Sequence, residues 1–345
     1  MFKPNFTITF KILNNLTKTA SAKALIDNAY LIPKWEVVLR REALILNAHA
    51  STAIEGNPLS LEEVSELAKG REIMATRKAK NEVLNYLKVL ELLPKLTDKG
   101  EITEKLILNI HHRLTKGVLD NPGDSGVYRN RQVVIGNRFT GRITFRPPDT
   151  RKVPALMKEF ITWLNRDDIA EIDAVIVSGI SHYEFVRIHP FIDGNGRTAR
   201  VLASLILYLR GFDTKRFFAL DDYYDGDRPA YYNALQSVDS KKLDTTEWLE
   251  YFTNGVALQV EKVKEKVLSL SGDRKKKEIK GQVALTERQM RIVERINTHG
   301  EITNRDVRGM FKLSDEGALK EIRKLMELGV LKSEGKGRSV RYLLA

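Results

Sequence analysis

The spacing of apolar residues along the chain predicts a protein built mainly from α-helices. Within residues 35–50, apolar side chains recur every three or four positions, which places them on one face of a helix. Gly56 and Pro58 follow this run and are typical of a helix stop. Ser60 and Glu63 have the spacing of a capping box that opens the next helix. The same periodicity predicts further helices at residues 76–93, 103–116, 152–165, 171–188, 197–210, 229–238 and 245–270.

One segment between these helices has the pattern of a β-hairpin. Two short runs rich in β-branched residues, 133–135 and 142–145, flank a turn that begins and ends with glycine. Pro147 and Pro148 end the second run. Because a lone hairpin is marginally stable in water, we expect it to pack against helices. Its extended edge, formed by Val133, Val134 and Ile135, would be able to pair with a segment of another protein.

The C-terminal part of the chain has a pattern of its own. Residues 271–281 contain few apolar side chains and predict a linker. Three short helical patterns and two β-type runs follow, which is the outline of a winged helix-turn-helix. These patterns cover residues 286–297, 303–310, 314–328, 329–331 and 340–343.

Composition narrows the class of protein. The 345 residues are 42% hydrophobic and 30% charged, which is ordinary for a globular protein. The chain has no cysteine, which excludes disulfide frameworks, cysteine zinc sites, iron–sulfur clusters and cysteine nucleophiles. No run approaches the ~18 apolar residues of a membrane span, and the N-terminus lacks a signal-peptide core. We therefore expect a cytoplasmic protein with no membrane partner.

The net charge of +12 is concentrated near the C-terminus. Residues 260–345 hold 21 basic and 13 acidic side chains, so they account for +8 of the total. Such a surface fits an anionic partner, and nucleic acid is the obvious candidate. A solvated, lysine-rich helical surface would have the same charge, so charge by itself does not decide between the two.

Residues 189–200 contain the strongest chemical signal. Pro190 disfavours helical geometry in the residue before it, so one helix must end at Ile188 or His189. Another helix is expected to begin near Gly196. The loop between them holds Gly194, and a glycine-rich loop that leads into a helix N-terminus is a ready site for an anion.

The charged residues of this segment favour a polyphosphate as that anion. Arg197 and Arg200 share a face of the first helical turn, where the helix dipole disfavours cations unless an anion binds. Asp193 offers an oxygen ligand for the Mg²⁺ that accompanies nucleotide phosphates. His189 is the nearby group that can accept a proton at neutral pH. A tight helix–helix turn would explain the histidine and one glycine, but not both arginines.

The segment from His189 to Arg200 resembles the motif of the Fic family, H-P-F-x-[D/E]-G-N-G-R-x-x-R, at every fixed position. The resemblance extends over roughly residues 35–260. Fic proteins are mostly α-helical and typically transfer AMP from ATP to a hydroxyl side chain of a target protein, releasing pyrophosphate. The resemblance therefore implies a protein adenylyltransferase with ATP as its substrate and Mg²⁺ as its cofactor. The implied partner is a target protein, and the resemblance also implies self-modification. The related Doc branch phosphorylates instead, but its motif departs at the glycine–arginine end.

The resemblance also implies a role for individual residues. His189 would deprotonate the target hydroxyl, and Asp193 would hold Mg²⁺. The hairpin resembles the family's flap, whose edge at Val133, Val134 and Ile135 would dock the target. The implied nucleotide-binding residues are Gly194, Asn195, Gly196, Arg197, Thr198, Ala199 and Arg200 in the motif, and Tyr231 and Tyr232 in a later helix.

A second motif resembles an inhibitory signature of the same family. Residues 51–57 fit the pattern [S/T]-x-x-x-E-[G/N], with Ser51 and Glu55 at its fixed positions. The resemblance implies that Glu55 reaches Arg200 and blocks placement of the γ-phosphate of ATP. The residues agree with this, because a carboxylate at a helix C-terminus is disfavoured by the dipole and needs a partner. The alternative is a solvent-exposed glutamate before a glycine cap.

The other histidines lack a metal-ligand pattern. His111 and His112 are adjacent, so they point to different faces of their helix. We expect one of them to pack inside and the other to be exposed. We also expect His182 to be a core residue.

Four regions follow from these patterns. Residues 1–99 form an N-terminal helical region with the inhibitory helix, 100–270 the Fic catalytic core, 271–283 a basic linker and 284–345 the winged helix. We expect the winged helix to bind DNA or a protein, and a homodimer is a further expected assembly. Asp315 and Glu316 oppose major-groove reading, so DNA contacts would come mainly from Lys336, Arg338, Arg341 and residues 274–280.

Three other functions stay open at this point. The Fic part could sense a nucleotide for a DNA-binding regulator. It could run the reverse reaction and remove AMP from a modified protein, with Glu55 positioning a water molecule. It could also use another nucleotide or a phosphocholine donor.

Overall fold

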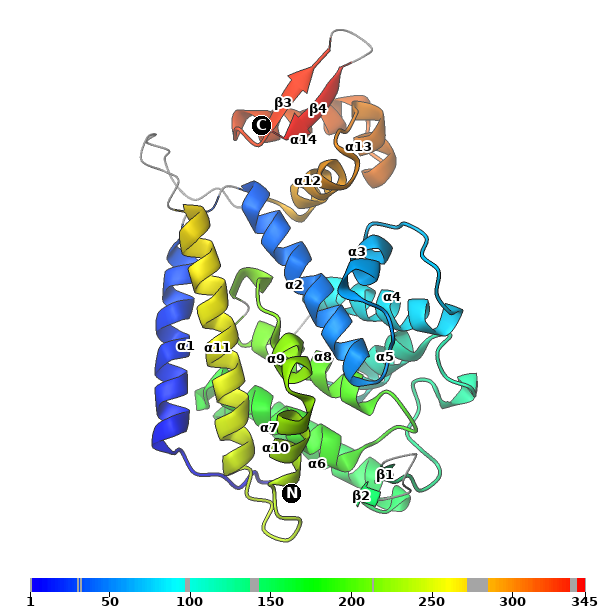
Figure 1. The fold of residues 1–345 in the computed structure, drawn as a ribbon, viewed down its shortest axis with the longest axis vertical. Coiled ribbons are helices and arrows are strands. Elements are labelled where there is room, and N and C mark those ends of the chain that lie inside the picture. Colours follow the sequence, from blue (N-terminus) through cyan, green and yellow to red (C-terminus); the bar gives the residue numbers. More distant parts are fainter. Residues whose placement is uncertain are drawn as a thin grey trace. The chain divides into compact units, whose positions relative to one another are not determined.

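The computed structural model describes residues 2–29, 31, 33–96, 100–136, 143–212, 214–271, 285–335 and 340–344. Over these residues the chain is mainly α-helical with two short antiparallel hairpins, which confirms the predicted fold class (Figure 1). The helices are α1 (Phe10–Asn28), α2 (Pro33–Ile54), α3 (Leu61–Ala68), α4 (Arg77–Leu92), α5 (Glu104–Thr115), α6 (Val153–Leu164), α7 (Ala174–Ile188), α8 (Asn195–Leu209), α9 (Leu220–Gly226), α10 (Arg228–Gln236), α11 (Thr246–Ser271), α12 (Glu287–His299), α13 (Asn304–Phe311) and α14 (Asp315–Glu327). The strands are β1 (Ile135–Gly136), β2 (Ile143–Phe145), β3 (Leu331–Glu334) and β4 (Arg341–Leu344).

The chain divides into two compact units. The larger unit comprises residues 1–22, 44–214 and 218–261, and the smaller unit comprises residues 23–43, 215–217 and 262–345. The four region boundaries expected from the sequence stay a prediction. No helix among the described residues combines the length and the apolar character that crossing a membrane requires.

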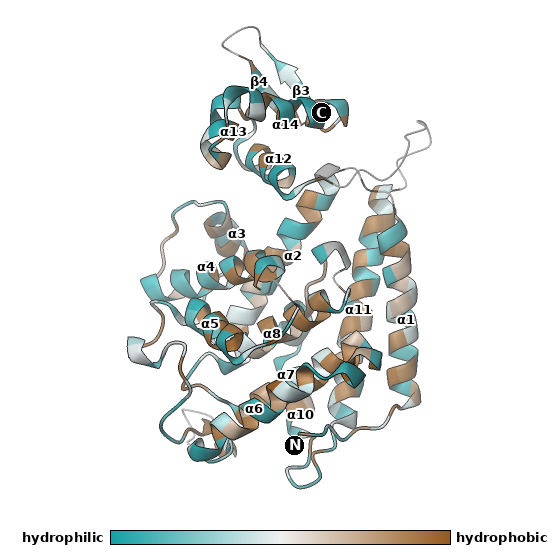
Figure 2. Ribbon diagram, turned by 180° about the vertical axis from the view of Figure 1, so that it is seen from behind, coloured by the Kyte–Doolittle hydropathy of each residue, from teal (hydrophilic) through white to brown (hydrophobic). Residues whose placement is uncertain are grey.

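Helices α7 and α8 form the centre of the larger unit. Nearly every side chain of α7 is buried, and the apolar colouring of both helices is visible in Figure 2. The Ser178 hydroxyl donates to the Ala203 carbonyl at 2.9 Å and joins the two helices. Gly179 lets α11 approach α7 closely, because a Cβ there would collide with side chains of Leu249 and Phe252. This packing positions the turn that connects α7 to α8.

Helix α1 was not predicted from the sequence. Polar and apolar residues alternate before it, and apolar side chains such as Phe10 and Leu13 are exposed on its surface. It is held beside α11, and the two helices run in the same direction (Figure 1). The Thr9 hydroxyl donates to Glu250 at 2.8 Å, and the Asn15 amide donates to the Thr253 hydroxyl at 3.1 Å. The short helix α9 was also missed.

The flap hairpin is shorter than the sequence predicts. Ile135 pairs with Phe145 and Gly136 with Ile143, so Val133 and Val134 precede the strand and are not part of it. Continued pairing would place Val133 opposite Pro147, and proline has no N–H to donate to a strand partner. Of the predicted turn, residues 137–141 lie outside the described residues, as does Arg142 of the second predicted run, while Gly136 belongs to β1.

The smaller unit contains three helices followed by a hairpin, in the order that the sequence predicts. Capping boxes at Thr286 and Thr303 open α12 and α13, and β3 pairs with β4 from Leu331 opposite Leu344. Its identification as a winged helix stays a prediction. Lys336, Arg338 and residues 272–283 of the predicted linker lie outside the described residues. Its buried apolar cluster includes Leu285, Ile292, Val293, Ile296, Ile302, Val307, Ala318, Ile322, Leu325, Val330, Leu331 and Tyr342.

Candidate active site

The turn between α7 and α8 has an unusual backbone. Helix α7 ends at Ile188, and His189 caps it in the left-handed region with φ 51° and ψ 59°. Such a conformation costs a residue other than glycine about 1–2 kcal/mol, so surrounding contacts must hold it. Gly194 also has a positive φ, of 81°, and α8 begins at the next residue. A Cβ at Gly194 would lie 2.9 Å from the Thr115 Cγ2, so this position requires glycine for two reasons.

Buried neutral side chains hold the loop in place. Asn195 exchanges hydrogen bonds with the backbone of Phe191, both at 2.9 Å. The Gly126 N–H donates to His111 Nδ1 at 2.9 Å, so that nitrogen carries the lone pair. His111 Nε2 therefore carries the proton and donates to the Asp193 carbonyl at 2.9 Å. His111 is fully buried and His112 is exposed, as expected.

A cavity of about 860 Å³ lies beside this turn, within the larger unit. The end of α2, the flap, the two central helices and α10 all contribute to its wall. Its wall brings together several predicted site residues that are far apart in the sequence. These are Glu55, Ile135, His189, Gly196, Arg200, Tyr231 and Tyr232.

The remaining predicted residues do not line this cavity. The Arg197 side chain is 3% exposed, and its guanidinium lies 3.4 Å from Glu82 and 3.3 Å from Asp193. Two of its nitrogens, Nε and Nη1, are buried without a hydrogen bond in the described part of the chain. Both arginines were expected to face an open anion site, whereas Arg197 turns toward α4. The other residues away from the wall are Ser51, Val133, Val134, Asp193, Gly194, Asn195, Thr198 and Ala199.

Arg200 is buried and is held by the end of helix α2. Its Nε donates to the Ser51 hydroxyl at 2.6 Å, and its Nη2 donates to the Ser51 carbonyl at 2.9 Å. The same Nη2 forms an ion pair with Glu55 at 2.8 Å. Glu55 also covers the start of α8, because a Cβ on Gly196 would collide with its Oε1. Its carboxylate therefore lies where the glycine loop would receive an anion.

A second carboxylate near Arg200, which is buried, was missed from the sequence. Asp221 is 2% exposed and accepts a hydrogen bond from the Tyr86 hydroxyl at 2.6 Å. Burial raises the pKa of Asp221, while the charge of Arg200 acts in the opposite direction. Asp221 lies in the short α9, whose mixture of acidic and aromatic residues has no periodicity to reveal a buried role. The negative charge of Asp221 stabilises Arg200 independently of Glu55.

His182 and Tyr231 complete the inner wall around Arg200. His182 is fully buried, as predicted, and its Nε2 lies 2.9 Å from the Tyr231 hydroxyl. Burial raises the pKa of Tyr231, so its hydroxyl stays protonated. Tyr231 is 2% exposed, while Tyr232 is 42% exposed and presents a free aromatic surface toward the cavity.

His189 is in the form that a general base requires. Its Nδ1 lies 3.2 Å from the Val186 carbonyl, which can only accept, so this nitrogen carries the proton. Nε2 is therefore the nitrogen with a free lone pair. Burial lowers the pKa of His189 to about 4, so the imidazole is neutral at neutral pH.

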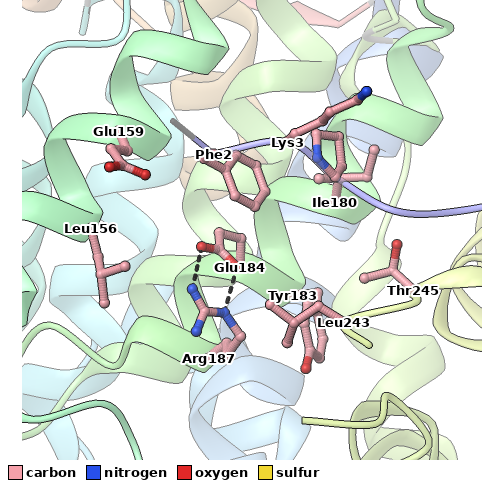
Figure 3. Close-up of a pocket in the computed structure, with 11 residues that line it drawn as sticks. Phe2, Lys3, Leu156, Glu159, Ile180, Tyr183, Glu184, Arg187, Leu243 and Thr245 are labelled. Carbon is pink, nitrogen blue, oxygen red and sulfur yellow. Dashed lines mark hydrogen bonds and ion pairs between the residues drawn. The ribbon is translucent and has the colours of Figure 1, made fainter. Parts of the chain in front are cut away.

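A smaller cavity of about 370 Å³ adjoins the first one (Figure 3). Tyr183, Arg187 and Leu243 line both. In the view of Figure 3 the Arg187 guanidinium pairs with the carboxylate of Glu184, with a shortest distance of 2.6 Å. Glu184 is 3% exposed, so this buried ion pair forms part of the wall between the two cavities.

The buried histidines predict that acid destabilises the larger unit. Burial lowers the pKa of His111 and His189 to about 4 and that of His182 to about 3, from 6.5. Between these values the unfolded chain binds more protons than the folded chain, so stability rises with pH. The contribution of these histidines to the free energy of unfolding is complete above pH 6.5 and is lost as the pH falls. For His111 this loss is about 3 kcal/mol. Urea midpoints at pH 7, 6, 5 and 4 would measure this, and a midpoint that stays constant would contradict it.

The carboxylate of Asp193 fits the role of a Mg²⁺ ligand that shares the ion with phosphates. Its side chain is 48% exposed, and its Oδ1 accepts from the Gly194 N–H. The described residues contain no group of three or more His, Asp or Glu side chains arranged around a common metal position. Mg²⁺ usually takes one or two protein carboxylates and completes its shell with phosphates and water, so a single carboxylate is compatible with it.

Comparison with known proteins agrees with this geometry. Residues 101–207 match the model of the Fic/DOC family. The protein adenylyltransferase Fic of Drosophila erecta is 31% identical over 227 residues, which cover 61% of this chain and 43% of that protein. The Drosophila virilis protein of the same name is 30% identical over 227 residues and is covered to 44%. The chain thus spans less than half the length of these relatives.

Solved structures show the same fold. A Fic family protein from Desulfovibrio desulfuricans G20 superposes with a TM-score of 0.67 and 25% identity, covering 100% of this chain and 98% of that one. Fic-1 from C. elegans gives a TM-score of 0.55 and 26% identity, with 74% and 72% covered. Residues 101–207 of this chain, which contain the His189–Arg200 motif, are therefore a Fic domain of the Fic/DOC family.

Proposed function

We propose that this protein transfers AMP from ATP to a hydroxyl group of a target protein and releases pyrophosphate. The observation that carries the proposal is the placement of two chemical functions in one cavity. The neutral imidazole of His189 and the glycine start of α8, at Gly196, line the same 860 Å³ space. A base and an anion site side by side are what nucleotidyl transfer to a hydroxyl requires. The resemblance to proteins named adenylyltransferases supports this choice of reaction.

The reaction balances with the groups present. His189 Nε2 takes the proton of the target Ser, Thr or Tyr hydroxyl as its oxygen attacks the α-phosphorus of ATP. The new P–O bond forms as the bond from the α-phosphorus to the bridging oxygen of the pyrophosphate breaks. Pyrophosphate leaves with the electron pair, and the protonated imidazole then returns its proton to solvent. The lowered pKa of His189, about 4, makes this return favourable at neutral pH.

The nucleotide would bind along the same wall. The backbone N–H at the glycine start of α8, at Gly196, would bind phosphate oxygens, with Arg200 as the cationic partner once Glu55 moves away. Tyr231 and the exposed ring of Tyr232 would contact the adenosine side. Asp193 would hold Mg²⁺, which supplies charge neutralisation to the phosphates when bound.

Glu55 would hold the enzyme in an inhibited state. Its carboxylate pairs with Arg200 at 2.8 Å and covers Gly196, so it competes with a phosphate for the cation and for the space. The remaining partners of Arg200, Ser51 and Asp221, keep the guanidinium charged and in place when Glu55 is displaced. Glu55 is the exposed member of the pair, 29% against 1%, so it is the side chain that is able to move.

Labelled ATP distinguishes this reaction from its alternatives. The purified chain and its Glu55→Gly variant are incubated with Mg²⁺ and ATP labelled at the α- or the γ-phosphate. Label on protein from α-labelled ATP alone supports AMP transfer, whereas label from γ-labelled ATP indicates phosphorylation. Removal of AMP from a modified protein by the unmutated chain would favour the reverse reaction, with Glu55 positioning water.

The basic C-terminal region predicts weak, salt-sensitive binding to DNA. If the smaller unit contacts DNA through its hairpin, phosphate contacts dominate and log K falls by about 0.9 for each phosphate neutralised. Arg341 has a half-exposed side chain that pairs with Glu301 at 2.9 Å, and Arg341→Ala should reduce the salt slope by about 1.

The full chain is titrated with duplex DNA at two salt concentrations. Arg166→Ala, which removes a surface arginine of the larger unit, serves as the matched control. Tight, salt-insensitive, sequence-specific binding would contradict the prediction that the hairpin of the smaller unit binds DNA through phosphate contacts. Absence of binding at low salt would favour a protein partner.

A further inference from the structure

We propose that Arg129 is a positioning residue that ties both ends of the flap to the backbone of His189. The inference rests on the proposed function, because it concerns how the base and the target hydroxyl are aligned. Arg129 lies in the segment between α5 and β1 and is 3% exposed. No step of the reaction described above uses it.

The first part of the evidence is at the catalytic turn. The Arg129 N–H donates to the Pro190 carbonyl at 2.8 Å, and its side-chain Nε donates to the His189 carbonyl at 2.9 Å. These two carbonyls belong to the turn where His189 has its positive φ of 51°. One residue therefore restrains the backbone on both sides of the Pro190 N–Cα bond, which sets the direction of the imidazole.

The second part is at the flap. The far side of the same guanidinium donates to the Gln132 side-chain carbonyl at 3.2 Å, to the Thr150 hydroxyl and to the Pro148 carbonyl. Gln132 precedes β1, while Pro148 and Thr150 follow β2, so these contacts join the two ends of the hairpin. Gln132 reinforces the junction, because its amide donates to the Pro147 carbonyl at 3.0 Å.

The acceptors explain why this position holds arginine. They are carbonyl, amide and hydroxyl oxygens spread around the whole guanidinium plane. A guanidinium presents five N–H donors in a fixed planar fork, whereas an ammonium presents three donors from one point. A lysine would keep the charge but could not reach the His189 carbonyl and the flap together. The role thus depends on shape more than on charge.

We expect Arg129 to affect the alignment of the target hydroxyl with His189 and not the affinity for ATP. Arg129 does not line the nucleotide cavity, whereas Ile135, Thr144 and Phe145 of the flap and His189 do. If the flap holds the target, Arg129 fixes the distance between the bound hydroxyl and the base. A small misplacement of reacting groups costs about 10²-fold in rate.

The test compares Arg129 with another arginine that binds backbone carbonyls. Arg210 donates from Nη2 to the carbonyls of Ile169, Ala170 and Ile172, at the far end of α8 from His189. Arg129→Lys, Arg129→Ala and Arg210→Ala are made in the full chain carrying Glu55→Gly. For each variant we measure kcat and KM for ATP by α-label transfer, the thermal midpoint, and hydrogen exchange of backbone amides.

We expect both Arg129 variants to lower kcat by about 10²-fold while KM for ATP changes by less than about threefold. Arg210→Ala should leave kcat close to that of its parent even where its thermal midpoint falls equally. Exchange should rise together at residues 131–136, 143–150 and 189–195 in the Arg129 variants. Parental kcat in Arg129→Lys, or a kcat loss in Arg210→Ala as large as in Arg129→Ala, would overturn the proposal.

Hydrogen exchange separates this proposal from the proposed function. If the Glu55→Gly parent transfers no label, AMP transfer fails, yet exchange still reports whether Arg129 joins the flap to the turn. Joint acceleration in the flap and turn segments would support the connection, and acceleration confined to one of them would refute it.

Discussion

Replacing His189 with alanine is expected to reduce AMP transfer by ~10²–10⁴-fold, the range that is typical for loss of a general base. The reason is that His189 lines the cavity with a neutral imidazole, whose Nε2 keeps a free lone pair because Nδ1 is held by the Val186 carbonyl. No other histidine lines that cavity in the described structure. The measurement is label transfer from α-labelled ATP to protein by the Glu55→Gly chain with and without His189→Ala.

Nucleotide binding is the control for this result. The dissociation constant for ATP should change little, because His189 is assigned to the proton and not to the phosphates. His299→Ala, in an exposed position of the smaller unit, should transfer label at the parental rate. A folded His189→Ala protein that labels its target at a near-normal rate would exclude His189 as the base.

Replacing Glu55 with glycine is expected to raise AMP transfer on the order of 10²-fold. A partly buried ion pair that contributes about 3 kcal/mol to the inhibited arrangement corresponds to roughly that factor in the ATP-competent population. The change frees the Arg200 guanidinium and the space over Gly196, while Ser51 still holds the arginine and the charge of Asp221 still stabilises it. Transfer rates at saturating ATP, with self-modification counted separately, would measure it.

Three further variants define the cause of that activation. Glu55→Gln keeps the size of the side chain and removes its charge, so it should activate only in part. Adding Arg200→Ala to Glu55→Gly should cancel the gain, because the phosphate partner is lost. Glu72→Gly, which removes an exposed loop carboxylate, should have no effect. If Glu55→Gly leaves AMP transfer unchanged or lower, the prediction that Glu55 inhibits transfer is wrong. Removal of AMP from a modified protein would then be the favoured function.

The periodicity of apolar residues determined most of the helices without any tertiary information. The predicted run at 76–93 is α4, and the one at 171–188 contains α7 with its end at Ile188, where Pro190 requires it. Local sequence is enough in such cases because a helix hydrogen-bonds within itself and shows its buried face every three or four residues. Helix α1 was not predicted because its exposed apolar residues Phe10 and Leu13 disturb that pattern.

The hairpin shows where local pattern stops being sufficient. Val133 and Val134 have the residue types of a strand, yet pairing begins only at Ile135. Whether a strand residue pairs depends on what lies opposite, and continued pairing would place Val133 opposite Pro147, which has no N–H donor. Register is a property of two segments, so one segment by itself predicts it poorly.

The catalytic and anion-binding residues of the site could be predicted from the sequence because they lie close together in it. The base, the glycine loop and both arginines lie within residues 189–200, and the inhibitory signature lies within residues 51–57. The motif resemblance implied the contact of Glu55 with Arg200 across 145 residues of chain. Only the tertiary structure decided the other partners: it turns Arg197 toward Glu82 and brings Asp221 and Arg129 to the site. Such contacts arise because a buried charge or carbonyl must find a complementary group wherever the fold supplies one, and local sequence contains no record of that distant neighbour.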